Sequence, residues 1–541
     1  MTQREPLSLD GSWQFWPDPT SILTPETLRE DEAQSIQVPA PWQAHSDDLR
    51  DYTGDAWYQR SFDVDGAWLD DRLFLHFGAV DYRAEVWLNG EYVGAHEGGY
   101  LPFEWDVTAH ATPGPNRLTV RVSDPPDLFA EIPHGKQSWY GPLSGIWQSV
   151  WLQCRAALHV QHVRVLPQLE TGRVSCHVRL SQPGEAGDAL VARIVGPDGT
   201  KVSSEERGVG EESGPVELTL QVDSVQAWSP GSPALYQLEL AVRRGDEVID
   251  TVVESFGFRT IEARNGYLYL NGQMIYLRGA LDQDYYPGTI STPPSLEFLE
   301  DQVRKAKTLG LNCLRCHIKV PDPRYYEVAD RLGMLIWTEL PNWHTLTTEA
   351  SERAWRTMEG IVERDGNHPS IIIWTLVNED WGTDLKHDPA HRAWLREAYE
   401  RLKVLDPTRL VVDNSPCEGN FHVVSDIEDY HFYRAIPDHA AEWDLFVNDF
   451  AARLAPTYSP FGDATRRGDE PLILSEFGNW GLPDVDQLRD AEGREPWWFA
   501  TGLEWGEGVV YPHDVQQRFR RWALAVGRRS SPPRSGRSSR R

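Results

Sequence analysis

The strongest constraint on the fold is a repeated alternation of strand-like and helical segments in the second half of the chain. From about residue 260 to residue 526, apolar runs suited to buried strands alternate with amphipathic patterns suited to helices. The expected strands are Met274–Arg278, Cys313–His317, Leu335–Leu340, Ser370–Asn378, Leu410–Asp413, Val424–Tyr430 and Leu472–Glu476. The expected helices are Ser295–Leu309, Pro323–Leu332, Glu349–Asp365, Ala390–Leu405 and Asp438–Leu454. This alternation predicts a parallel (β/α)8 barrel.

Such a barrel needs eight strands, and only seven are recognisable in the sequence. After the seventh come Trp497–Tyr511, a helix-like Val515–Val526, and residues 527–541, which hold six Arg and no acidic residue. A composition rich in Arg, Ser and Pro favours a disordered tail over a buried strand. We therefore expect a barrel without a recognisable eighth strand, in a chain less stable than a full-length relative. A frameshift near Val526 would explain the tail.

Two all-β regions precede the barrel. Residues 1–155 contain short strands separated by Gly, Pro and Asn turns, with a hairpin at Asn89-Gly90, and predict a β-sandwich. Residues 156–258 hold alternating strands within about 100 residues, the size of an immunoglobulin-like sandwich. A second Asn-Gly hairpin, Tyr267–Tyr276, leads into the barrel. The expected domains are thus 1–155, 156–258 and 259–526, followed by the tail 527–541.

Charge and cysteine content exclude several classes of partner and cofactor. The chain has 82 acidic and 52 basic residues, a net charge of −30, which argues against a nucleic-acid or anionic-membrane partner. No apolar run is long enough to span a membrane and none resembles a signal peptide, so we expect a cytoplasmic protein. The five cysteines are expected to be free thiols. Residues 313–317 match the C-x-x-C-H haem pattern but resemble a buried strand, so no cofactor is expected.

Two of the expected strands end in a glutamate. The strand that begins at Ser370 runs into Asn378-Glu379, and the strand that begins at Leu472 runs into Glu476. In a parallel barrel, catalytic side chains sit at the carboxyl ends of the strands. Two facing carboxyl groups supply what glycoside hydrolysis requires, since one protonates the leaving oxygen while the other attacks or activates water. The alternative is that both acids are solvated strand ends.

Motifs in three regions resemble glycoside hydrolase family 2, the family of β-galactosidases, β-glucuronidases and β-mannosidases. Residues 367–379 resemble its acid/base signature, and residues 474–478 resemble its nucleophile strand. Residues 77–90, 96–100 and 141–147 resemble its sugar-binding domain. The resemblance covers residues 7 to about 525. It implies a jelly roll, an immunoglobulin-like sandwich and a TIM barrel, in that order.

The resemblance implies a retaining exo-β-glycosidase that releases terminal β-linked sugars through a covalent glycosyl-enzyme. Glu379 would be the acid/base and Glu476 the nucleophile, with their carboxyl groups about 5–5.5 Å apart. Glu476 must be ionised to attack, and its charge helps to keep Glu379 protonated. Carbohydrate is the expected partner, and a homo-oligomer stays open. A galactose-like neutral sugar is favoured because no Asn-x-Lys element of the kind glucuronidases use is visible.

The same resemblance suggests further roles. Asn378 would bind the sugar 2-hydroxyl, Arg315 would keep the nucleophile ionised and Tyr433 would contact it. His431 stays open between sugar contact and packing, and Glu339 between facing the pocket and supporting it. The full set of expected substrate-binding residues is Asn378, Arg315, Tyr433, His431, Asp282, Asp284, His317, Trp381 and Trp480.

A metal and a non-catalytic function are the remaining alternatives. Asp429 and His431 lie two residues apart at a strand end, as in some metal-dependent barrel hydrolases. No matching His pair follows the first strand, so no metal is expected. The alternative function is an impaired or non-catalytic carbohydrate-binding relative, because the expected barrel is incomplete.

Overall fold

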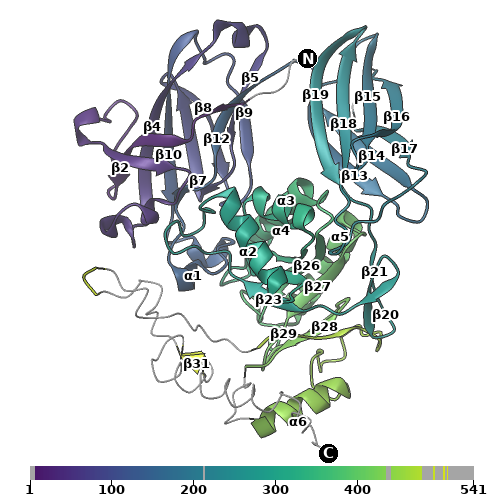
Figure 1. Cartoon of the computed structure of the whole chain (residues 1–541). Coiled ribbons are helices and arrows are strands. Elements are labelled where there is room, and N and C mark those ends of the chain that lie inside the picture. The colour runs from purple at the N-terminus through teal and green to yellow at the C-terminus, as the bar shows by residue number, and fades with distance from the viewer. Residues whose placement is uncertain are drawn as a thin grey trace, which may run out of the picture.

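The computed structural model describes residues 6–210, 214–433 and 440–477, with the short stretches 491–493, 504–505 and 508–509. Two β-sandwiches precede a parallel barrel. Figure 1 shows the first sandwich in purple and the second in teal, with the green barrel beneath and between them. The predicted fold class of jelly-roll-like sandwich, immunoglobulin-like sandwich and TIM barrel is confirmed. Within these residues no helix combines the length and apolar character needed to cross a bilayer.

The first sandwich packs two antiparallel sheets around one core. One sheet has the order β1 (Leu7–Ser8), β12 (Val150–Arg155), β5 (Arg72–Phe77) and β9 (Phe103–Asp106). The other has the order β3 (Gln34–Val38), β2 (Gly11–Asp18), β4 (Gly54–Val64), β10 (Gly114–Asp124), β7 (Arg83–Leu88) and β8 (Glu91–Glu97). A small pair joins β6 (Val80–Asp81) to β11 (Gly145–Ile146). The predicted Asn89-Gly90 hairpin connects β7 to β8 with positive φ at both residues, as a type I′ turn requires.

The second sandwich has a core of its own, built from inward-facing alternate residues. Its sheets are β13 (Val160–Pro167), β14 (Arg173–Leu180) and β17 (Val216–Gln221) against β16 (Lys201–Gly208), β15 (Asp188–Val195), β18 (Tyr236–Arg244) and β19 (Glu247–Phe256). Two buried side chains tie it to the barrel. The Trp228 indole N–H donates to the Asp330 carbonyl, and the Arg259 guanidinium donates to the carbonyls of Pro369, Ile371 and Thr408.

Seven parallel strands of the barrel lie in the described residues. Five form one ladder in chain order: β23 (Gly279–Asp282), β24 (Cys313–Cys316), β25 (Leu335–Glu339), β26 (Ile371–Asn378) and β27 (Leu410–Ser415). The other two, β28 (Glu428–His431) and β29 (Leu472–Glu476), pair with each other. The prediction of the first strand at Met274–Arg278 is wrong. Those residues follow the Asn271-Gly272 turn. The first two of them, Met274 and Ile275, belong to a hairpin sheet made of β20 (Ile261–Arg264), β21 (Tyr267–Leu270) and β22 (Gln273–Ile275).

The barrel helices lie close to their predicted ranges. They are α2 (Leu296–Thr308), α3 (Pro323–Leu332), α4 (Thr348–Asp365), α5 (Pro389–Leu405) and α6 (Ala440–Ala451). Side-chain oxygens of Ser295, Asp322, Thr347 and Asp388 cap the first four by accepting backbone N–H bonds, which is why these helices start where they do. The predictions for Val515–Val526, for the missing eighth strand and for the tail 527–541 lie outside the described residues. Residues 497–511 are described only at β30 (Glu504–Trp505) and β31 (Gly508–Val509).

A loop of the first sandwich lies in the mouth of the barrel. The backbone N–H groups of His134 and Gly135 both donate to the Asn342 carbonyl at 3.0 Å. Gly135 has φ +58°, and a Cβ there would lie 2.2 Å from the Ile318 carbonyl oxygen, so only glycine fits. The short helix α1 (Gln137–Tyr140) follows directly. The sandwich therefore forms one wall of the site that the strand ends define.

Candidate active site

Glu379 stands at the carboxyl end of β26 in a left-handed backbone conformation. Its φ is +52° and that of Asp380 is +65°, in a region that non-glycine residues rarely occupy. Neighbouring groups hold this turn, since the Glu379 N–H donates to the Ser415 carbonyl at 2.9 Å and the Asp380 N–H to Asn414 Oδ1 at 3.0 Å. Backbone strain that the surroundings fix in this way is typical of functional sites.

Glu476 ends β29 and is surrounded by donors. Arg315 donates from its terminal guanidinium nitrogen to Glu476 Oε1 at 2.9 Å, and the Tyr433 hydroxyl donates to Oε2. Burial alone would raise the pKa of Glu476, but His431, Arg315, His317 and Lys136 outweigh it and hold that pKa well below its usual range. An ionised carboxylate is what a nucleophile requires.

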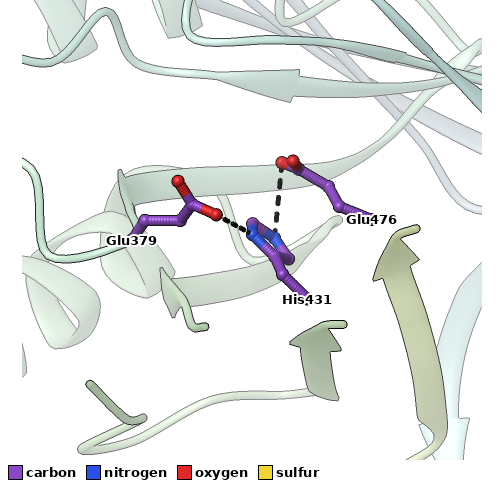
Figure 2. A group of neighbouring side chains, drawn as sticks. All are labelled: Glu379, His431 and Glu476. Atoms are coloured by element: carbon purple, nitrogen blue, oxygen red, sulfur yellow. Dashed lines mark hydrogen bonds and ion pairs between the residues drawn. The ribbon is translucent and has the colours of Figure 1, made fainter. Parts of the chain in front are cut away.

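The two glutamates face each other across His431, as Figure 2 shows. One carboxylate oxygen of each lies within 4.8 Å of the other and of a ring nitrogen of His431. The Tyr433 hydroxyl also lies 3.5 Å from Glu379 Oε1. Inverting glycosidases separate their carboxyl groups by about 6.5–9.5 Å and retaining ones by about 5–5.5 Å. The spacing therefore fits direct attack by one carboxylate better than attack by an intervening water.

Asn378 presents a hydrogen-bond donor that the described part of the chain leaves unused. Its Oδ1 accepts from Arg315 at 3.0 Å, which fixes the orientation of the amide. Its Nδ2 is buried and has no hydrogen-bond partner among the described residues. A buried donor without a partner is costly, so this Nδ2 is available to an oxygen atom of a ligand.

Glu339 and His317 support Arg315 from behind. Glu339, at the end of β25, accepts from the Arg315 Nε and from His317 Nδ1 at 2.8 Å, and it is fully buried. Burial opposes its ionisation, but Arg315 and His317 lower the pKa of Glu339 to about 2. The Arg315 side chain is only 4% exposed and its pKa lies above the ordinary value because of Glu339 and Glu476, although burial opposes this. This arrangement fixes the guanidinium against the nucleophile.

The sequence analysis did not identify Lys136, a residue of the first sandwich, as part of the site. Lys136 is 3% exposed, and its ammonium lies 3.2 Å from the centre of the Trp139 ring and 4.5 Å from that of Trp381. Burial lowers the pKa of Lys136 to about 8, although Glu476, Glu379 and Glu339 act in the opposite direction. No strand-end rule applies to a sandwich loop, so no signal in the sequence pointed to it.

Ser415 was missed although a strand-end rule could have found it. It ends β27, next to the strand of Glu379, and its hydroxyl lies 2.8 Å from His431 Nε2. The same rule would have included Asn414, which holds Asp380.

The remaining predicted residues contact other protein groups, lie at the edge of the site, or fall outside the described residues. They are Asp282, Asp284, Trp381 and Trp480. The Asp282 carboxylate accepts from the Asp284 N–H and the Tyr325 hydroxyl, both at 2.9 Å. Asp284 pairs with Lys319 at 2.7 Å, and burial raises its pKa to about 6. Their contact with sugar hydroxyls therefore stays a prediction. Trp381 is half-buried at the mouth beside Lys136, whereas Trp480 lies outside the described residues.

A cation could by distance alone touch Glu379, His431 and Glu476 together. However, the same atoms are already joined by hydrogen bonds and ion pairs, and the Arg315 guanidinium lies 2.9 Å from Glu476. Two positive groups at one carboxylate repel each other. The expectation that no metal binds here stays a prediction.

Comparison with known proteins agrees with this architecture. The family models "Glycosyl hydrolases family 2, sugar binding domain", "Glycosyl hydrolases family 2" and "Glycosyl hydrolases family 2, TIM barrel domain" match residues 7–155, 158–259 and 261–485. A β-galactosidase of Aeromonas hydrophila is 30% identical over 604 residues, covering 97% of this chain and 56% of that protein. A putative β-glucuronidase of Formosa agariphila is 27% identical over 413 residues, covering 73% of this chain and 49% of that protein.

A solved structure shows the same fold. The β-glucuronidase from Ruminococcus gnavus in complex with D-glucuronic acid superposes with a TM-score of 0.77 at 22% identity, covering 98% of this chain and 90% of that one. The fold and the matches together define a carbohydrate-active protein in which two sandwiches precede a barrel. The chain belongs to glycoside hydrolase family 2. It spans about half the length of the curated relatives it matches.

Proposed function

We propose that the protein is a retaining exo-β-glycosidase that hydrolyses terminal β-linked sugars through a covalent glycosyl-enzyme. One observation carries this proposal: Glu379 and Glu476 place carboxylate oxygens within 4.8 Å of each other at two strand ends. Glu476 attacks the anomeric carbon while Glu379 protonates the departing oxygen, and Glu379 then takes a proton from the water that cleaves the ester. Arg315 and Tyr433 keep Glu476 ionised and oriented, and Asn378 Nδ2 binds the 2-hydroxyl.

The sugar is proposed from the relatives. The curated matches include several β-galactosidases, and the printed sequence shows no Asn-x-Lys element, so we propose a galactose-like neutral sugar as the first candidate. The structural neighbour bound to D-glucuronic acid makes β-glucuronides the second. We expect the first sandwich to take part in binding, since its loop reaches the mouth of the barrel.

Trapping the intermediate tests the mechanism and the sugar together. Incubation with 2-deoxy-2-fluoro-β-glycosyl fluorides of galactose, glucose, mannose and glucuronic acid, followed by mass spectrometry, should yield an adduct on Glu476 with one of them. Glu379→Ala should release β-glycosyl azide when azide is added. Glu418→Gln, at an exposed position of the loop after β27, is the control and should react like the unaltered protein. Unchanged hydrolysis by Glu476→Gln would overturn the assignment.

The non-catalytic alternative is decided by the same experiment. This alternative rests on the expected lack of an eighth barrel strand, and the residues that bear on that strand lie outside the described ones. A chain that binds the fluorides reversibly without forming any adduct would be a carbohydrate-binding relative.

A further inference from the structure

We propose that His431 shares one proton with Glu379 and thereby sets the pH range over which Glu379 can act as an acid. This inference rests on the proposed function, since it assigns the source of the proton that the leaving oxygen receives. It makes His431 a positioning residue that acts through Glu379, a role different from the sugar contact or packing expected from the sequence.

The contact between the two side chains is short, and its histidine is fully buried. His431 Nδ1 lies 2.7 Å from Glu379 Oε1, and the histidine side chain is 0% exposed. Figure 2 shows the imidazole between the two carboxylates, with Nε2 turned toward Glu476 at 3.4 Å. At this separation a single hydrogen lies between Nδ1 and Oε1 and can be bonded to either atom.

Ser415 assigns the other ring nitrogen. Its hydroxyl lies 2.8 Å from Nε2 and donates its single hydrogen to the Asp429 carboxylate. The Ser415 oxygen must therefore accept from Nε2, which fixes a hydrogen there. Arg315 also lies 3.3 Å from the same nitrogen, and its terminal nitrogen has a second hydrogen besides the one that it donates to Glu476. That contact would need Nε2 as an acceptor, so we assign the hydrogen on Nε2 from the shorter Ser415 contact at 2.8 Å.

Two protonation states remain once Nε2 carries a hydrogen. Either Nδ1–H donates to an ionised Glu379, or a neutral imidazole accepts from the protonated carboxyl group. The two states differ only in the position of one proton. Removing that proton would leave two lone pairs facing each other at 2.7 Å, so the pair holds it, in line with the raised pKa of His431.

The charges around the ring support proton retention. Glu379 and Glu476 flank it, Asp429 lies behind Ser415, and the Tyr433 ring packs edge-on with centroids 6.3 Å apart. Arg315 opposes a further positive charge. Burial would lower the pKa of His431, but the two glutamates outweigh both effects and raise it. His317, Glu339 and Lys136 act from farther out, through Glu476.

The shared proton is consumed and restored within one turnover. As the glycosidic bond breaks, its electron pair stays on the leaving oxygen, which takes this proton from Glu379, while a Glu476 oxygen forms the ester bond to the anomeric carbon. The His431 ring is then neutral, with a hydrogen on Nε2 and none on Nδ1. Water next attacks the anomeric carbon, the ester bond breaks to regenerate the Glu476 carboxylate, and the water proton returns to Glu379 and His431.

The pH profile of kcat/KM tests the proposal. His431→Gln supplies an amide that hydrogen-bonds but cannot take up a proton, so the alkaline limb should move to lower pH by about one unit or more. His368→Gln is the matched control, because His368 is also paired with a carboxylate at 2.6 Å but belongs to the turn before β26. It should lower stability without moving either limb. An unchanged alkaline limb in His431→Gln would overturn the proposal.

Ser415→Ala provides a second test that keeps the imidazole in place. Without the hydroxyl, the neutral ring can move its hydrogen to Nδ1 and donate it permanently to Glu379, so the alkaline limb should again shift downward, by less. If His431→Gln does not fold, this variant decides, and an unshifted limb refutes the sharing. A fluoroglycoside adduct on Glu476 together with unshifted limbs would refute the proton sharing alone, whereas absence of the adduct would refute the glycosidase.

Discussion

Replacing Glu339 with glutamine should destabilise the barrel by an amount that depends on pH. Glu339 is fully buried, and its carboxylate accepts from Arg315, from His317 and from the Ile318 N–H. Its pKa lies at about 2 instead of 4.5, because Arg315 and His317 overcome the effect of burial. At 1.36 kcal/mol per pKa unit, ionised Glu339 stabilises the native state by about 3 kcal/mol.

The sign follows from the lowered pKa. The stabilisation is complete above the unfolded-state pKa near 4.5 and is lost as the pH falls through the native value of about 2. Glu339→Gln should therefore lower the free energy of unfolding by about 3 kcal/mol at pH 7 and by only about 1.5 kcal/mol at pH 3.

Urea denaturation at pH 3 and pH 7, followed by tryptophan fluorescence and circular dichroism, measures both values. Glu400→Gln, on the exposed side of α5, is the control and should change stability by less than about 0.5 kcal/mol. A loss below about 1 kcal/mol at pH 7, or an equal loss at both pH values, would refute the view that Arg315 is held by an ionised buried carboxylate.

Three further variants test the mouth of the barrel. Lys136→Met removes a charge that holds the pKa of Glu476 down, so the acid limb of kcat/KM should move to higher pH; an unmoved limb contradicts this. Gly135→Ala should cost about 1–2 kcal/mol of strain plus the clash with Ile318, and calorimetry should show it melting below Gly90→Ala, which has positive φ but open space. Asn378→Ala should lower kcat/KM by roughly 10²–10³ for ordinary aryl glycosides and far less for 2-deoxy glycosides.

Local patterns predicted most of the barrel. Strands such as β26 are continuous apolar runs that end at polar residues, and helices such as α3 start at a capping Asp and a Pro, so both have sharp boundaries in the sequence. The first strand failed because Met274–Arg278 is as apolar as a barrel strand, while the residues that form it, Gly279–Asp282, are short and half-exposed. The start of the more apolar segment, Met274–Arg278, pairs instead with the strand before the Asn271-Gly272 turn.

The site was predictable only where the chain order carries it. Glu379, Glu476 and Arg315 lie at the carboxyl ends of strands, so the barrel geometry alone brings them together. The proton network of His431 depends on Ser415 and Asp429, whose hydroxyl and carboxylate meet through tertiary packing. Lys136 comes from another domain, and its position is fixed by backbone bonds to Asn342 that no residue pattern encodes.

The loop of the first sandwich also constrains the order in which a working protein is made. Lys136 leaves the ribosome roughly 340 residues before Glu476, and N-terminal domains generally fold first during synthesis. The loop is then a finished template against which the barrel mouth closes, with Gly135 against Ile318. Exchange of the sandwich between relatives would consequently also exchange the lysine whose charge acts on Glu476 and Glu379 in the barrel.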